Sequence, residues 1–205
     1  FNWPSWLHSG NNSRNELRDM TGAELGRWLS KTISWYTKGG FDAQHRSPYH
    51  YVWKHFEVFN EPHHAMEHWP CATDCGRGSY CAACAREYAR IFDGVAAVLR
   101  SDHPELQLHG LSDDWRSTMD RSHTWSSEFF SRHNHGPDAK PPEYASYHFY
   151  AFLPQGRALD MSRFNVSFVF AQATGFARQA RAIRAQLDSA DWGGRSTKLN
   201  FDEVG

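Results

Sequence analysis

Apolar residues recur at helical spacing in four stretches of the chain, and each stretch is long enough for an amphipathic helix. The predicted helices run from Thr21 to Gly39-Gly40, from Tyr88 to Leu99 with a stop before Pro104, over a short stretch after Thr124, and from about Arg163 to Leu187. Thr21 and Glu24 have the spacing of an N-terminal capping box, and the paired glycines are typical of a helix end.

Short apolar segments of strand length lie between and after these helices. They are Phe56 to Phe59, Leu106 to Leu111, Tyr144 to Tyr150 and Lys198 to Val204. Strict alternation of helix and strand predicts a parallel sheet with crossover helices, either a barrel or an open doubly wound sheet. No Gly-x-Gly-x-x-Gly loop follows any of these segments, which disfavours a dinucleotide-binding sheet.

The number of predicted strands indicates part of a barrel. A complete (β/α)8 barrel takes about 250 residues, whereas this chain has 205 and four predicted strands. We therefore predict a single α/β domain over residues 1–205, a partial TIM barrel that contains about strands 3/4 to 7. The chain would then begin near the end of the third strand.

Four cysteines fall in one window, within an insert at about residues 68–85, and must act together or not at all. A disulfide-stabilised loop is our preferred interpretation, and it would imply an oxidising compartment. Free thiols and a zinc knuckle, with His64 and His68 as further ligands, are the alternatives. The cysteines are Cys71, Cys75, Cys81 and Cys84.

Composition excludes some partners and leaves others open. The net charge is -1, which disfavours a nucleic-acid or membrane-surface partner, and no apolar run is long enough to span a membrane. Aromatic residues make up 15% of the chain, with nine Trp. These rings serve either core packing or stacking on sugar rings, and composition does not choose between the two.

The strand ends carry polar residues suited to glycoside cleavage. Barrel enzymes place their chemistry at the carboxyl ends of the strands. There the sequence has Asn60-Glu61-Pro62, His148 to Tyr150, and Asp202-Glu203. Two carboxyl groups about 5 to 5.5 Å apart support retention of configuration, one as acid/base and one as nucleophile. We expect a neighbouring carboxylate and partial burial to keep the acid protonated.

With these motifs the chain resembles glycoside hydrolases of clan A, and more closely family 39, which contains β-xylosidases and α-L-iduronidases. The resemblance is strongest in the run Phe-Glu-Val-Phe-Asn-Glu-Pro, from Phe56 to Pro62, followed by His63-His64 as in the iduronidase branch. Tyr144 to Tyr150 is similar to the sixth strand of the family, and Leu199 to Gly205 to its nucleophile strand. The chain departs from the family at Phe59, where Trp is usual, and in its cysteine-rich insert.

Six residues are candidates for the site, five of them implied by the resemblance and the sixth, His63, because it directly follows the motif. Glu61 would be the acid/base and Glu203 the nucleophile, although strand alternation places Glu203 on the face of Leu199 and Phe201, opposite Asp202. The substrate-binding candidates are Asn60, which would bind the sugar's 2-hydroxyl, together with His148, Tyr150 and His63.

The predicted function is therefore a retaining glycoside hydrolase that acts by double displacement and is α-L-iduronidase-like or β-xylosidase-like. The alternative is a non-catalytic carbohydrate-binding relative of the same fold. We predict a carbohydrate substrate, no cofactor, no metal, no nucleic acid and no membrane partner, and secreted or lysosomal localisation. The oligomeric state stays open.

Overall fold

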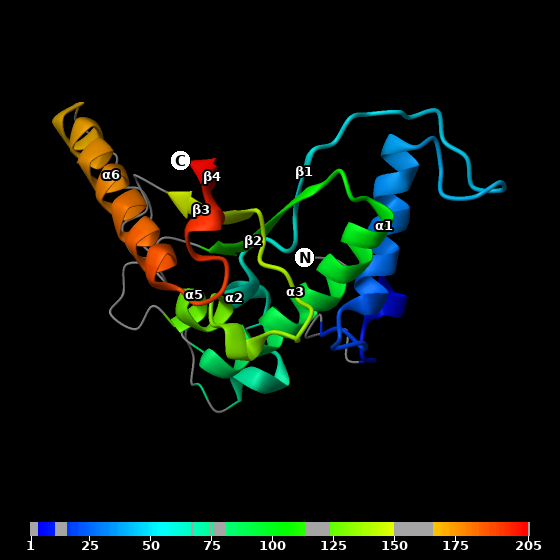
Figure 1. The fold of residues 1–205 in the computed structure, drawn as a ribbon, viewed down its shortest axis with the longest axis horizontal. Helices are drawn as coiled ribbons and strands as arrows, with labels where there is room; N and C mark the ends of the chain where they lie inside the picture. The colour runs from blue at the N-terminus through cyan, green and yellow to red at the C-terminus, as the bar shows by residue number, and fades with distance from the viewer. Residues whose placement is uncertain are drawn as a thin grey trace.

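A computed structural model describes residues 4–10, 16–66, 68–73, 75, 81–113, 124–149 and 166–204. Its centre is a sheet of parallel strands in the order β1-β2-β3-β4, so neighbours along the chain are neighbours in the sheet (Figure 1). The strands are β1 (His55–Glu57), β2 (Gln107–Asp113), β3 (Tyr144–Phe149) and β4 (Lys198–Val204). In a doubly wound sheet the strand order changes direction at one point. The four described strands show no such change, so the arrangement is that of part of a (β/α) barrel.

The helices alternate with the strands as the apolar pattern predicts. The α-helices are α1 (Ala23–Thr37), α2 (Pro62–Ala65), α3 (Ala82–Asp102), α5 (Thr124–Phe129) and α6 (Val166–Ser189). Short 3-10 turns are η1 (Ser5–Leu7), η3 (Pro70–Ala72), η4 (Arg132–Asn134) and η6 (Gly194–Ser196). Helices α1 and α6 lie at opposite ends of the molecule in Figure 1. None of the helices in the described part of the chain is long and apolar enough to cross a membrane.

Helix α3 joins the sheet to the other helices through a buried aromatic core. Tyr88 is fully buried, and its hydroxyl donates to the Val58 carbonyl at 2.9 Å and accepts from the Leu111 amide at 3.1 Å. One side chain of α3 thus holds together the carboxyl ends of β1 and β2. The rings of Phe92 and Phe129 pack edge to face nearby, at 5.1 Å between centroids.

The start of α1 differs from the predicted capping box. Gly22, in the left-handed region at φ 77°, is the N-cap. The Asp19 carboxylate accepts from the Glu24 amide at 2.8 Å and from the Thr21 amide at 3.0 Å, which is the role expected of Thr21. The Glu24 side chain pairs with Arg18 instead of reaching back to the N-cap. The prediction of a Thr21–Glu24 box is therefore wrong, because an acid two residues earlier satisfies the free amides.

The four cysteines form two nested disulfides, as the preferred interpretation expects. Cys71 bonds to Cys84 and Cys75 to Cys81, with Cα atoms 5.1 and 5.2 Å apart. None of these four sulfurs is left as a thiolate, so the zinc-knuckle alternative is wrong.

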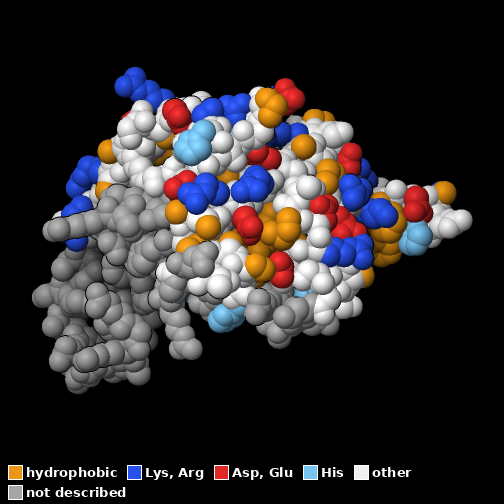
Figure 2. Space-filling view, turned by 90° about the horizontal axis from the view of Figure 1, so that it is seen from below, with side chains coloured by type: hydrophobic (Ala, Val, Ile, Leu, Met, Phe, Trp, Pro, Cys, Tyr) orange, Lys and Arg blue, Asp and Glu red, His pale blue; other side chains and the backbone are white. Residues whose placement is uncertain are grey.

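The surface seen in Figure 2 mixes both signs of charge. Lys and Arg side chains alternate there with Asp and Glu over the described part of the face. This distribution agrees with the nearly balanced net charge of the chain.

Helix α3 should be sensitive to a methyl group at Gly94. A Cβ at this position would lie 1.9 Å from the Thr21 carbonyl oxygen, which is backbone and cannot move aside cheaply. Gly94→Ala should therefore lower the free energy of unfolding by roughly 1–3 kcal/mol in urea titrations. Helix propensity alone would instead raise the free energy of unfolding by about 1 kcal/mol, because Ala favours a helix more than Gly does.

The matched control is Gly136→Ala, because the nearest atom to a Cβ there is an Asp93 oxygen at 3.9 Å. Its free energy of unfolding should stay within about 0.5 kcal/mol of the unsubstituted protein. A Gly94→Ala protein as stable as the unsubstituted one would contradict the close approach of α3 to Thr21.

Candidate active site

The carboxyl ends of β1 and β2 have unusual backbone geometry. Among the described residues that are not glycine, positive φ angles occur at Phe59 (71°), Glu61 (46°), Leu111 (86°) and Ser112 (44°). Side chains disfavour this region, and such residues concentrate where function requires a particular orientation. All four follow β1 or lie in β2, which marks this edge of the sheet as the candidate site.

Glu61 is held by its backbone as well as by its side chain. It is the N-cap of α2, and its amide donates to the Ser112 carbonyl at 2.9 Å. This bond ties the Asn-Glu-Pro motif to the neighbouring strand. The half-buried carboxylate then meets His148, with Oε1 at 3.0 Å from Nδ1.

A bulge in β4 brings Glu203 into the site. Tyr147 pairs with Phe201 and His148 pairs with Glu203, so Asp202 is an extra residue in β4. Strict alternation would leave Glu203 on the face of Phe201, whose ring packs on Phe176 of α6 at 4.6 Å. The bulge instead places Glu203 Oε2 2.9 Å from His148 Nδ1. The prediction that Phe201 and Glu203 share a face is therefore wrong.

His148 is the centre of the cluster, and its side chain is only 1% exposed. Nδ1 faces Glu61 and Glu203, and Nε2 lies 3.1 Å from Ser112 Oγ and 3.9 Å from Asp202 Oδ1. Burial on its own would lower the imidazole pKa. The hydrogen bond to Glu61 and the charges of Asp202 and Glu203 outweigh burial, so the pKa of His148 is raised.

The two candidate catalytic carboxylates lie close together. One oxygen of Glu61, one of Glu203 and a nitrogen of His148 all lie within 4.8 Å of one another. This approach is slightly closer than the separation of about 5 to 5.5 Å between the carboxyl groups of retaining glycosidases, and much closer than the roughly 6.5 to 9.5 Å of inverting ones. The pKa of Glu61 is lowered, mainly by its hydrogen bond from His148. The expectation that Glu61 stays protonated in the free site is therefore wrong, because an imidazole lies beside it.

Asn60 lines an open cavity of about 360 Å³ in front of the cluster. Its Oδ1 accepts from the Ser112 hydroxyl at 3.3 Å. The cavity is lined by His55, Phe56, Glu57, Asn60, His109, His148, Asn200, Asp202 and Glu203. Most of these side chains are polar, and they come from all four strands or the segments that follow them.

A larger cavity, of about 680 Å³, lies against α1 and is remote from the strand ends. Its two carboxylates are already paired, Glu24 with Arg18 and Asp102 with the Ser30 hydroxyl. The smaller cavity is therefore the candidate active site, because it holds the carboxylates that face each other.

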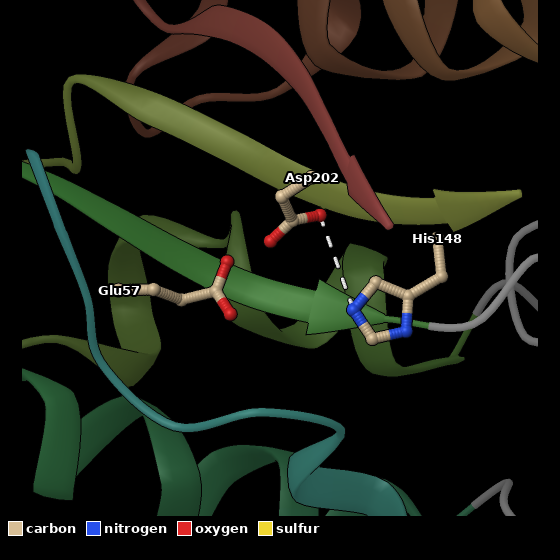
Figure 3. Close-up of side chains that lie close together, drawn as sticks. All are labelled: Glu57, His148 and Asp202. Carbon is tan, nitrogen blue, oxygen red and sulfur yellow. Dashed lines mark ion pairs between the residues drawn. The ribbon is translucent and has the colours of Figure 1, made fainter. Parts of the chain in front are cut away.

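Glu57 and Asp202 form a second acidic pair beside His148. Figure 3 shows both carboxyl groups and the imidazole turned toward one another, and their nearest ligating atoms lie within 4.8 Å. Burial, and then the adjacent carboxylate of Asp202, raise the pKa of Glu57 to about 8. Distances alone would admit a cation here. However, His148 is committed to Glu61, Glu203 and Ser112, so we interpret the group as a hydrogen-bonded acid pair.

Two predicted substrate-binding residues have a different status. The His63 side chain is 0% exposed and lies 3.1 Å from Asp113, with Trp125 edge-on at 6.2 Å. It therefore packs beneath the site, where it supports α2, and does not line the cavity. Tyr150 falls outside the described residues.

Glu57 and Ser112 of the cluster were not predicted, and neither was Asp113, which pairs with His63 beneath the site. Glu57 could have been found from its period-two spacing with His55, which places both polar side chains on one face of β1. Ser112 and Asp113 carry no comparable signal, because a bulge between Leu111 and Asp113 sets their orientation.

Comparison with known proteins gives only a distant likeness. No protein-family model and no curated protein matches the chain. It resembles a GH39 β-xylosidase from Caulobacter crescentus (TM-score 0.42, 17% identity, 73% of this chain and 24% of that one). A GH39 enzyme from Xanthomonas axonopodis pv. citri is similar to the same degree (TM-score 0.42, 19% identity, 74% and 25%). The chain spans about a quarter of each, and the likeness is a distant one in fold.

The acid pair predicts how stability depends on pH. Folded Glu57 keeps its proton up to a pKa of about 8, against 4.5 for an ordinary glutamate. The folded state therefore binds more protons than the unfolded state between these values, and the free energy of unfolding falls as pH rises from about 4.5 to about 8. Glu57→Gln should remove this dependence and be more stable than the unsubstituted protein at pH 8, by roughly 1–3 kcal/mol.

Urea titrations at pH 5, 6, 7 and 8 measure this effect. Asp138→Asn, a change of charge on an exposed residue, is the control and should leave the pH profile unchanged. Parallel profiles for Glu57→Gln and the unsubstituted protein would contradict the raised pKa.

Proposed function

We propose that this site belongs to a retaining glycoside hydrolase with Glu61 as acid/base and Glu203 as nucleophile. The observation that supports this most directly is the approach of the two carboxylates to within 4.8 Å. At that spacing one carboxylate can reach the anomeric carbon while the other reaches the glycosidic oxygen. An inverting enzyme needs a wider gap, about 6.5 to 9.5 Å, to admit a water molecule.

The reaction then takes two steps. Glu203 attacks the anomeric carbon as Glu61 gives a proton to the departing oxygen, which forms a glycosyl-enzyme ester and releases an alcohol. In the second step Glu61 takes a proton from water, and the resulting hydroxide displaces Glu203 from the same carbon. The sugar leaves with its original anomeric configuration.

His148 supplies an explanation for how Glu61 obtains its proton. In the free site the imidazole hydrogen-bonds Glu61 and lowers the pKa of that carboxyl. A sugar bound between the carboxylates excludes water and separates Glu61 from the imidazole. Both changes raise the pKa of Glu61 toward the range that a general acid needs.

The sugar itself belongs to the same proposal, with an α-L-iduronide and a β-xyloside as the candidates. A uronate needs a cationic partner for its carboxylate, whereas a xyloside does not. Turnover of aryl xyloside against aryl iduronide by the full-length protein separates the two.

Replacement of Glu203 tests the nucleophile. In the full-length protein, Glu203→Ala should lower kcat on an aryl glycoside by roughly 10⁴-fold or more. Azide should restore turnover, because a small anion can occupy the space left by the carboxylate. The product would be a glycosyl azide of inverted configuration, which NMR identifies.

Asp202→Ala is the matched control, because Asp202 is the neighbouring carboxylate in the bulge. It should show no azide rescue. Rescue of Asp202→Ala, with Glu203→Ala still active, would reverse the assignment of the nucleophile.

The second candidate is a non-catalytic carbohydrate-binding relative. One observation favours it: His148 Nδ1 lies 3.0 Å from Glu61 and 2.9 Å from Glu203, in the space that an anomeric carbon must enter. A protein of this kind would bind sugars in the cavity without cleaving them.

Covalent trapping distinguishes the two candidates. An activated 2-deoxy-2-fluoro glycoside should add one sugar to the full-length enzyme, since the fluorine slows hydrolysis of the ester. Intact mass spectrometry should show the mass increase, and peptide mapping should locate it at Glu203. Sugar binding by calorimetry with no mass increase and no turnover would favour the non-catalytic relative.

A further inference from the structure

Ser112 has an unusual position for a serine. It is the extra residue of the β2 bulge, between the pairs Leu111–Ser146 and Asp113–Tyr147, and it is fully buried. Its φ of 44° lies in the left-handed region, which costs free energy for any residue other than glycine. Such a conformation persists only where surrounding contacts hold it.

Those contacts reach several residues of the candidate site. The Ser112 amide donates to Ser146 Oγ at 3.1 Å, and its carbonyl accepts from the Glu61 amide at 2.9 Å. Its hydroxyl lies 3.3 Å from Asn60 Oδ1 and 3.1 Å from His148 Nε2, and it also hydrogen-bonds the carboxyl group of Glu57. One residue therefore contacts the acid/base backbone, the candidate sugar-binding amide and the central imidazole.

The hydroxyl has a single proton and three polar neighbours, so it donates to only one of them at a time. If Ser112 donates to Asn60 Oδ1, it must accept from a protonated His148 Nε2. The reverse direction would require a neutral Nε2 and a turned Asn60 amide. Three carboxylates face this imidazole: those of Glu61, Glu203 and Asp202. Their negative charge favours the imidazolium and therefore the first direction.

We infer that Ser112 is a positioning residue: it accepts from His148, donates to Asn60, and so turns the Asn60 amide nitrogen toward the sugar. Asn60 lines the cavity, and its oxygen is already committed to Ser112. The nitrogen is thus the group that meets a sugar hydroxyl. In retaining glycosidases a hydrogen bond to the 2-hydroxyl strengthens in the transition state. This inference rests on the proposed function for its kinetic consequence.

A substrate lacking the 2-hydroxyl reveals this role. In the full-length protein, Ser112→Ala should lower kcat/KM on an aryl glycoside roughly tenfold, the effect of one misdirected hydrogen bond. On the matching aryl 2-deoxyglycoside the same variant should act within about twofold of the unsubstituted enzyme, because the contact is already missing. An equal loss on both substrates would overturn the inference and indicate a merely structural role.

Ser126→Ala is the matched control. Ser126 is also fully buried, and its hydroxyl lies 3.1 Å from the Tyr147 hydroxyl, outside the cavity. Any loss of activity in this variant should be the same on both substrates.

Nitrogen NMR of His148 provides a readout that needs no activity. The unsubstituted protein at neutral pH should show both ring nitrogens protonated, and Ser112→Ala should titrate at lower pH, since Nε2 has lost its acceptor. An unprotonated Nε2 at neutral pH would overturn the inference. If the unsubstituted protein cleaves no aryl glycoside, the proposed function fails, and the NMR result alone decides the position of Ser112.

Discussion

The imidazole of His148 is the interaction on which the geometry of the candidate site depends. Glu61 follows β1 and Glu203 lies in β4, so the two carboxylates come from the two outer strands of the described sheet. Two negative charges within 4.8 Å repel each other strongly in a partly buried setting. Protonation of the His148 ring from β3 offsets that repulsion, and the carboxylates raise the pKa of the ring. Ser112 from β2 contacts the other side of the ring. All four strands thus meet at one side chain.

Much of this arrangement is predictable because it depends on local patterns. Helical and strand periodicities are properties of short segments, so the element order follows from the positions of apolar residues. Parallel strands linked by helices bring their carboxyl ends to one edge. Asn60, Glu61, His148 and Glu203 are therefore predicted from the sequence to share one site, and the structure brings these four together.

The rest depends on pairing between distant segments, which periodicity does not contain. One extra residue in β4 reverses the face of Glu203, and one in β2 turns Ser112 into the site. The local pattern gives no sign of either bulge. The lowered pKa of Glu61 also depends on a distant segment, because it is caused by the imidazole of His148, 87 residues away in the sequence. From the sequence, His63 is predicted to contact substrate because it follows the motif directly. Its ring is buried instead, next to Asp113 of β2.

The nested disulfides have a consequence for how this protein is produced. Helix α2, which begins directly after Glu61, has four residues and no side-chain cap at its N-terminus. The segment after it is joined covalently to the first turn of α3 by Cys71–Cys84. The covalent link to a long, well-packed helix contributes stability that so short a helix lacks. Correct folding of the segment around Asn60-Glu61-Pro62 therefore calls for an oxidising expression host or oxidative refolding of the recombinant protein.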